Sequence, residues 1–235
     1  MLARLTHFAR QRSPAEIGEL LLLNMRHAAR RFTAAERARR DADDAFDRLW
    51  GTDTGGVRTV GSLGIDSVDS HRLHGYQAAQ DAMFDRLLSA IDIDPAGYGF
   101  VDYGSGKGRI LLLAALRPFA HVTGIEIAPA MHAIAEANIA LFSGKAPVAS
   151  GPVRSLCCDA RAFDPPAGPL VTYFYNPCHG EILRPMVAKL EATHAAAPRP
   201  IWALYLEPLF PEAFEASGHW TLVEADDGYR IYRLG

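Results

Sequence analysis

The chain has 235 residues, of which 49% are hydrophobic, and its 24 Lys and Arg stand against 27 Asp and Glu for a formal net charge of −3. This length suits one large domain, or one domain with an appendage, and a substantial buried core. The charge balance neither favours nor excludes nucleic acid, no run of 18 apolar residues predicts a membrane span, and three cysteines without Cys-x-x-Cys spacing predict neither disulfides nor zinc.

The first 50 residues are predicted to form a basic helical extension. Residues 1–40 contain nine Arg and three Glu. The sequence SPAE at residues 13–16 is typical of a helix start, with a capping serine followed by proline at the first helical position. A second helix start is predicted at Thr33, where Glu36 follows three residues later. No long apolar core with a small-residue cleavage site is present, so we expect a cytoplasmic protein.

The extension has two candidate roles. Charge runs usually form solvated faces, so we favour a helical cap over the rest of the protein or a contact in a homodimer. The alternative is a basic arm that gathers an acidic substrate such as RNA. Within residues 1–40, Phe8 and Phe32 are the only aromatic residues, so platforms for base stacking are few.

Residues 51–75 are predicted to be a glycine-rich linker. The sequence GTDTGG at residues 51–56 opens it, and this composition is typical of loops and domain boundaries. The linker would separate the extension from a main domain at residues 76–235. His71 and His74 lie three residues apart with no second ligand pair nearby, so no metal site is predicted.

Residues 100–113 are predicted to form a strand, a tight loop and a helix. A short apolar run reaches Asp102, glycines stand at 104, 106 and 108, and an apolar run of helix formers follows. Glycines let the backbone turn sharply and let a ligand approach where a Cβ would collide. The unpaired N–H groups of the helix point back into the loop. The stretch therefore predicts a binding site for a polar ligand.

Spacing distinguishes three classes of ligand for this glycine loop. The phosphate cradle of an NTPase needs Ser or Thr after Gly-Lys to hold magnesium, whereas Gly108 follows Lys107 here. The dinucleotide fingerprint needs a small residue at its third position, which Arg109 occupies. The pattern that remains is Asp-x-Gly-x-Gly-x-Gly.

This pattern resembles the first motif of the class I S-adenosylmethionine-dependent methyltransferases. The resemblance covers residues 95–235, and an uncharacterised bacterial subgroup shares the loop, a Gly-x-Asp-Thr-x-Gly segment and an Asn-Pro pair after the fourth strand. It implies S-adenosylmethionine as the cofactor, with the loop around its methionine end. The implied loop contacts are Asp102, Gly104, Ser105, Gly106, Gly108 and Arg109.

Two acids and one aromatic residue complete the implied cofactor site. Residues 121–126 predict a second strand that ends in Glu126, whose carboxylate can accept both ribose hydroxyls, although its spacing also suits a dinucleotide. Residues 153–160 predict a third strand, and the resemblance places Asp159 at the adenine amino group; acids are also common at strand ends. Tyr76 is the implied aromatic over the cofactor, or a residue that only packs.

The part of the site that would face the transferred methyl group is expected after a fourth strand, predicted at residues 170–175. Asn176 and Pro177 resemble the Asn-Pro-Pro-aromatic motif of amino methyltransferases, in which the Asn oxygen and the Pro carbonyl hold an amine. Cys178 and His179 depart from that motif at its last two positions. His179 is therefore a candidate general base, and the alternative is a solvated histidine at a helix start. The implied catalytic set is Asn176, Pro177 and His179.

The predicted fold class is α/β. We expect a doubly wound, Rossmann-like sheet of seven strands with a C-terminal antiparallel hairpin, plus the N-terminal helical extension. The remaining elements are helices at about residues 78–91, 127–141 and 181–196, a strand at 201–206, and hairpin strands at 219–224 and 229–234.

The function implied by the resemblance is methyl transfer by in-line displacement to a nitrogen or oxygen nucleophile of a small molecule or a protein amine. One alternative is an RNA or protein methyltransferase that docks through the basic helices. Another is a protein that binds adenosylmethionine without catalysis. The sequence does not name the methyl acceptor.

Overall fold

The computed structural model describes residues 34–59, 61 and 72–235. The helix predicted at residues 13–16, the cap at Thr33 and the side chain of His71 lie outside these ranges. The chain divides into two units, Met1–Ala42 and Asp43–Gly235, and the division falls within helix α3 (Ala34–Trp50). The predicted domain boundaries at residues 50 and 75 stay predictions. No described helix is both long enough and apolar enough to cross a membrane.

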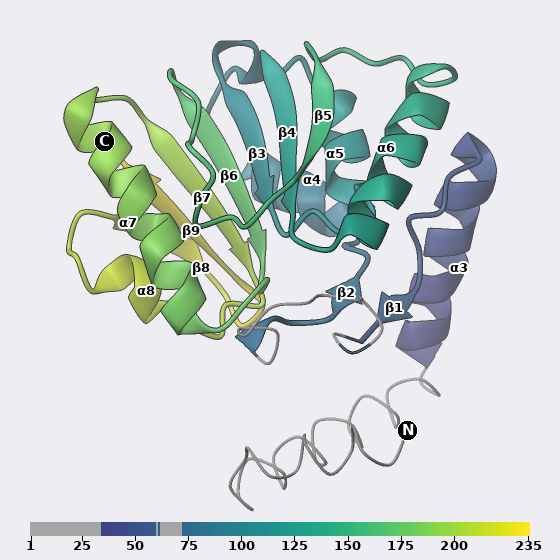
Figure 1. The fold of residues 1–235 in the computed structure, drawn as a ribbon, viewed down its shortest axis with the longest axis horizontal. Coiled ribbons are helices and arrows are strands. Elements are labelled where there is room, and N and C mark those ends of the chain that lie inside the picture. The colour runs from purple at the N-terminus through teal and green to yellow at the C-terminus, as the bar shows by residue number, and fades with distance from the viewer. Residues whose placement is uncertain (1–33, 60, 62–71) are drawn as a thin grey trace, which may run out of the picture. The chain divides into compact units, whose positions relative to one another are not determined.

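The second unit is built on a mixed sheet of seven strands in the order β5-β4-β3-β6-β7-β9-β8 (Figure 1). The first five strands in chain order, β3 to β7, are parallel, whereas β9 runs antiparallel to both β7 and β8. This arrangement confirms the predicted fold class, including the C-terminal hairpin. The strands are β3 (Gly99–Tyr103), β4 (His121–Glu126), β5 (Val153–Cys157), β6 (Leu170–Tyr175), β7 (Ile201–Leu206), β8 (Thr221–Ala225) and β9 (Tyr229–Leu234).

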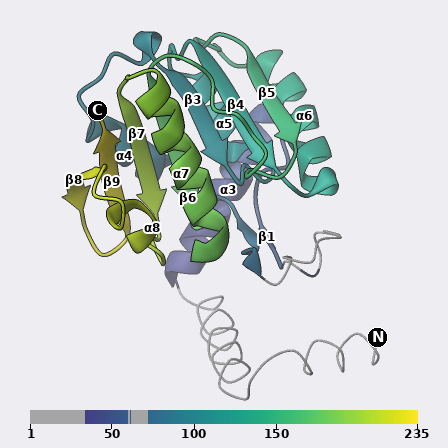
Figure 2. The same cartoon turned by 60° about the vertical axis from the view of Figure 1, so that its left-hand side comes forward.

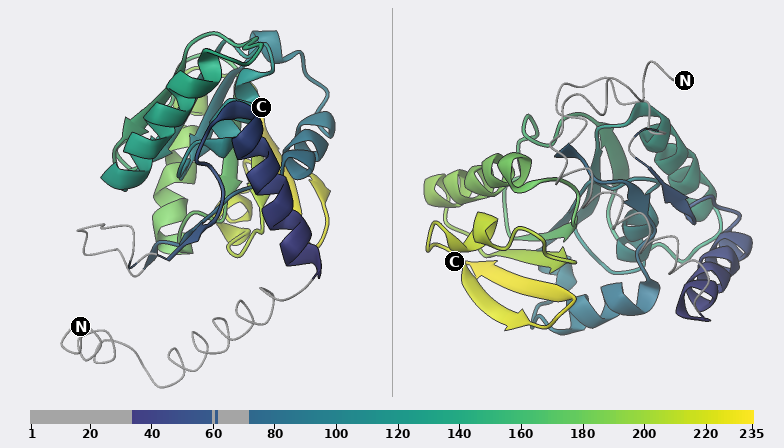
Figure 3. Two further views of the ribbon diagram at one scale, coloured as in Figure 1. Left: turned by 90° about the vertical axis from the view of Figure 1, so that its right-hand side faces the viewer. Right: turned by 90° about the horizontal axis from the view of Figure 1, so that it is seen from below.

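Helices cover both faces of this sheet, and Figures 2 and 3 show the layers. On one face lie α4 (Asp81–Ser89), α5 (Arg109–Ala115) and α6 (Pro129–Ser143); on the other lie α7 (Gly180–Ala196) and α8 (Glu212–Glu215), and a 3-10 turn, η3 (Pro95–Gly97), precedes β3. Side chains alternate between the faces along each strand. Phe100 therefore packs with α4 and α5, and its neighbour Val101 packs with α7.

The strand order reverses at β3, because β3 pairs with β4 on one side and with β6 on the other. The next strand in the chain, β4, lies on one side of β3, and the later strand β6 lies on the other. The chain therefore leaves the two sides of β3 in opposite directions. In open α/β sheets, ligands bind in the crevice beyond the carboxyl ends of the strands at such a reversal. The glycine loop follows β3 directly, so the topology places it at this crevice.

Part of the predicted linker is paired as a small second sheet. Strand β1 (Val57–Arg58) pairs antiparallel with β2 (Tyr76–Gln77), and Figure 1 shows both below the carboxyl ends of the central strands. The predicted helix at residue 78 begins later, at Asp81, because the preceding backbone is extended in β2 and then passes through two buried alanines. The third strand likewise ends at Cys157 rather than at residue 160. The chain then turns, and the Arg161 amide donates to the Asp159 side chain in this turn.

Candidate functional site

The glycine loop has the backbone geometry that its sequence predicts. Gly104, Gly106 and Gly108 have φ angles of +84°, +53° and +88°, a region that favours glycine. The amides of Gly104 and Ser105 donate to the Ile125 carbonyl at 2.9 and 3.0 Å, which fastens the start of the loop to β4. Gly108 is the residue that precedes α5, so the first turn of that helix opens toward the loop.

Two side chains from distant segments close on the glycine loop. A Cβ on Gly104 would lie 2.8 Å from the Cβ of Pro177, and a Cβ on Gly106 would overlap the ring of Tyr76. The loop therefore lies between Pro177, two residues after β6, and Tyr76, the first residue of β2. The Oγ of Ser105 is buried over Gly124 and has no hydrogen-bond partner among the described residues.

Glu126 ends β4 and binds the glycine loop directly. Its Oε2 accepts from the Gly106 amide at 2.8 Å, and its Oε1 accepts from the Ala128 amide at 2.7 Å. Burial raises the pKa of this carboxyl, and the backbone amides partly oppose the rise. A carboxylate has about four accepting positions, so Glu126 can still accept from a ligand hydroxyl.

Asp102 is the second acid at this point of the sheet, and only 3% of its surface is exposed. Burial raises the pKa of Asp102 well above its usual range, and the nearby charge of Glu126 adds to the rise. The structure thus brings Asp102, Glu126, the glycine loop, Tyr76 and Pro177 close together. Their roles in binding a cofactor stay predictions.

The segment that follows β6 is fixed by residues before β2. The φ angle of Asn176 is +38°, which is uncommon outside glycine. Its carbonyl accepts from Nδ1 of His74 at 2.7 Å, and the Pro177 carbonyl accepts from the His74 amide at 3.1 Å. Leu73 and Cys178 form an antiparallel bridge. The Oδ1 of Asn176 is buried and makes no hydrogen bond to any residue that the structure describes.

The two histidines at this segment differ in the nitrogen that can accept a proton. A carbonyl only accepts, so Nδ1 of His74 carries the hydrogen, and the lone pair of the neutral ring is on Nε2. His179 precedes α7, and its Nδ1 accepts from the Glu181 amide at 3.4 Å, which puts its hydrogen on Nε2. Its ring also lies 4.5 Å from that of Phe210. The accepting nitrogen of neutral His74 is thus Nε2, whereas Nδ1 of His179 already accepts from the backbone. Sequence reasoning considered His74 only as a metal ligand or a surface or site histidine, and the role of His179 as a base stays a prediction.

Asp159 is engaged by its own turn. Its carboxylate accepts from the Arg161 amide at 2.8 Å and from the guanidinium of the same residue at 2.6 Å. These contacts with Arg161 lower the pKa of Asp159. The implied contact with adenine stays a prediction, and it would compete with Arg161.

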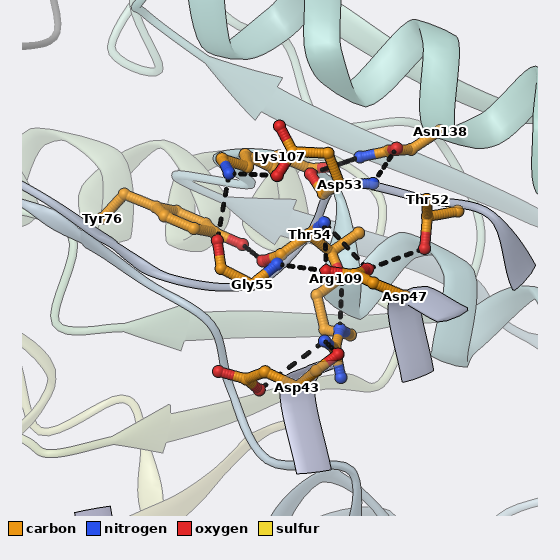
Figure 4. A network of polar contacts seen from close by, with 10 residues as sticks. All are labelled: Asp43, Asp47, Thr52, Asp53, Thr54, Gly55, Tyr76, Lys107, Arg109 and Asn138. Carbon is orange, nitrogen blue, oxygen red and sulfur yellow. Dashed lines mark hydrogen bonds and ion pairs between the residues drawn. The ribbon is translucent and has the colours of Figure 1, made fainter. Parts of the chain in front are cut away.

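The Arg109 side chain is bound by protein groups rather than turned into the glycine loop (Figure 4). Its Nε donates to Thr54 Oγ1 at 2.6 Å, its Nη1 to Asp81 at 3.0 Å, and its Nη2 lies 3.6 Å from Asp43. The guanidinium also stacks over Phe46 at 3.9 Å. A cofactor contact by this side chain would have to displace these partners, so only its backbone amide remains well placed at the start of α5.

Sequence reasoning missed a polar network around residues 51–56. Asp47 accepts from Thr54 and from Gly55, and Lys107 donates to Asp53 at 2.6 Å. The available signal was Lys107 itself, since a lysine inside an apolar strand-loop-helix stretch needs a partner for its charge. No group of three or more His, Cys, Asp or Glu residues that could hold a metal ion occurs in the described part of the chain.

No protein-family profile matches the chain, and no curated protein matches it. Similar solved structures include TrmN from Thermus thermophilus, at 22% identity and a TM-score of 0.46 over 66% of this chain and 48% of that one, about half its length. An RNA methyltransferase from Salinibacter ruber in complex with S-adenosyl-L-homocysteine has 21% identity and a TM-score of 0.45 over 66% and 91%. The magnesium protoporphyrin IX methyltransferase ChlM from Synechocystis PCC 6803, with bound SAM, has 15% identity and a TM-score of 0.43 over 65% and 76%. These are similarities of fold.

Proposed function

We propose that the protein is an S-adenosylmethionine-dependent methyltransferase that acts by in-line displacement on a nitrogen or oxygen nucleophile of a small molecule or a protein amine. The observation that carries the proposal is the hydrogen bond from the Gly106 amide to Glu126. This bond joins the Asp-x-Gly-x-Gly-x-Gly loop after β3 to the acid at the end of β4. A loop that faces an acid in this way suits an adenosine-linked amino acid.

The donor set fits this cofactor. A methionine zwitterion needs N–H donors for its carboxylate, which the loop and the start of α5 supply, and an acid near its ammonium group, which Asp102 supplies. Glu126 keeps accepting positions for the ribose hydroxyls. A Cβ on Gly104 would fill the cradle beside Pro177, so glycine at this position keeps it open.

Alignment is the main contribution of this chain to the reaction. When bound, the cofactor supplies an electrophilic methyl group on a sulfonium. Asn176 and Pro177 lie against the glycine loop and are held there by His74, so they are placed to orient the acceptor. The buried Oδ1 of Asn176 can accept a hydrogen bond from an amine or a hydroxyl. Held geometry of this kind supplies roughly 7 to 11 kcal/mol of a barrier.

An acceptor that carries a proton must lose it. The Nε2 of His74 has the lone pair for this step, whereas in neutral His179 the lone pair is used to cap α7. Burial lowers the pKa of His74, and its contacts with Asn176 partly oppose the decrease, so the ring is neutral at pH 7 and able to accept. A positioned base adds roughly two to four decades in rate.

The alternative acceptors remain RNA or a larger protein, for which the nine arginines of residues 1–40 are the supporting observation. A protein that binds the cofactor without catalysis is the third reading. Its only support is Cys178, which stands where the amino methyltransferase motif has proline.

The test is calorimetric titration with S-adenosylmethionine, S-adenosylhomocysteine and NAD. We expect micromolar binding of the first two ligands and none of NAD. The Gly106→Val variant should lose this binding, because valine would be strained at φ +53° and would strike the Tyr76 ring. Binding of NAD alone would instead make the protein a dinucleotide enzyme.

A further inference from the structure

We infer that Gly51–Gly56 is a wall of the cofactor site, and that the ion pair between Asp53 and Lys107 positions the Tyr76 ring over Gly106. The inference rests on the proposed function and deepens it. It gives a role to a segment whose composition alone predicts a linker, and to the lysine of the glycine loop.

Lys107 links the glycine loop to this segment. Its Nζ donates to Asp53 Oδ1 at 2.6 Å and to the Gly55 carbonyl at 3.0 Å. The Lys107 side chain is 3% exposed, whereas that of Asp53 is 64% exposed. A buried ammonium needs its partners, because an unpaired charge away from water is strongly destabilising. Lys107 is thus committed to the segment rather than to a phosphate.

Tyr76 links the same segment to the next residue of the loop. Its hydroxyl donates to the Thr54 carbonyl, and its ring lies where a Cβ on Gly106 would be. The Nζ of Lys107 lies 5.9 Å from the ring centroid. Residues 106 and 107 of the loop therefore contact neighbouring residues of one segment, through Tyr76 and through Asp53. Figure 4 shows Tyr76, Lys107 and Asp53.

The segment is itself built to hold one shape. Asp47 accepts from Thr52 Oγ1 at 2.7 Å, from the Thr54 amide at 2.9 Å and from the Gly55 amide at 2.8 Å. Asn138 of α6 brackets Asp53, since it accepts from the Asp53 amide at 2.8 Å and donates to its carbonyl at 2.9 Å.

The two ends of the segment also favour one fixed shape. Gly51 and Gly56 have φ angles of +75° and +85°, so glycine turns the chain at both ends. A flexible linker would not need this set of bonds. A wall that fixes an aromatic ring against the glycine loop does need them.

The experiment is calorimetric titration of the full chain with S-adenosylhomocysteine. The Asp53→Asn variant keeps the size of the side chain and removes its charge. We expect its Kd to rise roughly tenfold, because displacement of a binding group by about 1 Å can cost far more. Its melting temperature should also fall, because the buried Lys107 ammonium loses its charged partner and keeps the Gly55 carbonyl, so the titration is run at a temperature at which circular dichroism shows the variant to be folded. The matched control is Asp164→Asn, which breaks the 2.7 Å pair of an 87% exposed acid with Lys189; its Kd should not change.

A double variant tests whether Asp53 acts through Tyr76. Tyr76→Leu removes the ring, and Asp53→Asn added to it should weaken binding no further. Equal affinity of Asp53→Asn and the wild type would overturn the inference and leave the proposed function standing. Additive losses would overturn the route through Tyr76. Failure of the wild type to bind the ligand would overturn the function and the inference together.

Discussion

Two carboxyl groups near the ends of neighbouring strands dominate the chemistry of the site at the scale of single residues. Asp102 and Glu126 are both buried and both have a raised pKa, and the charge of Glu126 adds to the rise of the Asp102 pKa. Their positions could be predicted, because an acid near the end of an apolar strand must lie by the crevice. The raised pKa could not be predicted, because it depends on burial by segments distant in the sequence.

Asp102→Asn should therefore stabilise the protein and weaken its cofactor site. The folded state holds the Asp102 proton to higher pH than the unfolded state, so this group costs stability as pH rises from about 3.8 through the folded pKa. Urea unfolding at pH 5 and pH 8 should show that the variant exceeds the wild type in free energy of unfolding by more at pH 8 than at pH 5. Its affinity for S-adenosylmethionine should fall about tenfold or more, because asparagine cannot give up a proton to pair with the ammonium group of the cofactor. A variant less stable than the wild type at pH 8 would contradict this account.

His74 has the opposite effect on stability. Its folded pKa is lowered by burial, so the unfolded state binds its proton more readily, and stability falls as pH drops below about 6.5. His74→Gln keeps an N–H donor for the Asn176 carbonyl and removes the titration. We expect its free energy of unfolding to decline less steeply from pH 7.5 to 5.5 than that of the wild type. His179→Gln is the control. If the free energy of unfolding of His74→Gln declined with pH as steeply as that of the wild type, His74 would not be the group responsible.

At the scale of elements, the strand-loop-helix unit around the glycines could be predicted, and the segment at residues 51–56 could not. The unit consists of contiguous residues, and its strand, loop and helix are determined by the periodicity of apolar residues and the spacing of glycines within that stretch. The segment takes its shape from partners such as Lys107 and Asn138, which are 54 and 85 residues away from Asp53. Glycine, threonine and aspartate are typical of any loop, so only these distant contacts distinguish a wall from a linker.

Asp47 is the residue on which that segment depends most. Asp47→Ala removes the acceptor of the Thr52 hydroxyl and of the Thr54 and Gly55 amides, so we expect a loss of about 1 to 3 kcal/mol in the free energy of unfolding. Asp44→Ala, at an exposed position of the same helix, controls for the helix propensity of alanine. Guanidinium unfolding measures both. Equal stability of the two variants would show that water replaces the lost acceptor.

At the scale of the whole molecule, the order of the seven strands follows from a few rules. Alternating strands and helices predict a parallel sheet, its crossovers have one hand, and the last two strands are close enough to form a hairpin. The role of the extension does not follow from such rules. Residues 1–40 carry a formal charge of +6, and the remaining residues carry −9. This asymmetry is compatible with a contact between two copies of the chain and equally with binding to RNA.

Salt dependence separates these two roles. A docking arm that neutralises several phosphates of a single strand would give a slope of log K against log salt of about −0.7 per phosphate. We favour the cap or dimer contact, so we expect the full chain to bind a single-stranded RNA no more tightly than about 100 μM at 150 mM salt. Filter binding between 50 and 200 mM KCl measures this. Light scattering on the same samples reports whether copies associate. Micromolar RNA binding with a steep slope would instead identify RNA as the acceptor to test first, because positioning a nucleic acid over the methyl site requires such an arm.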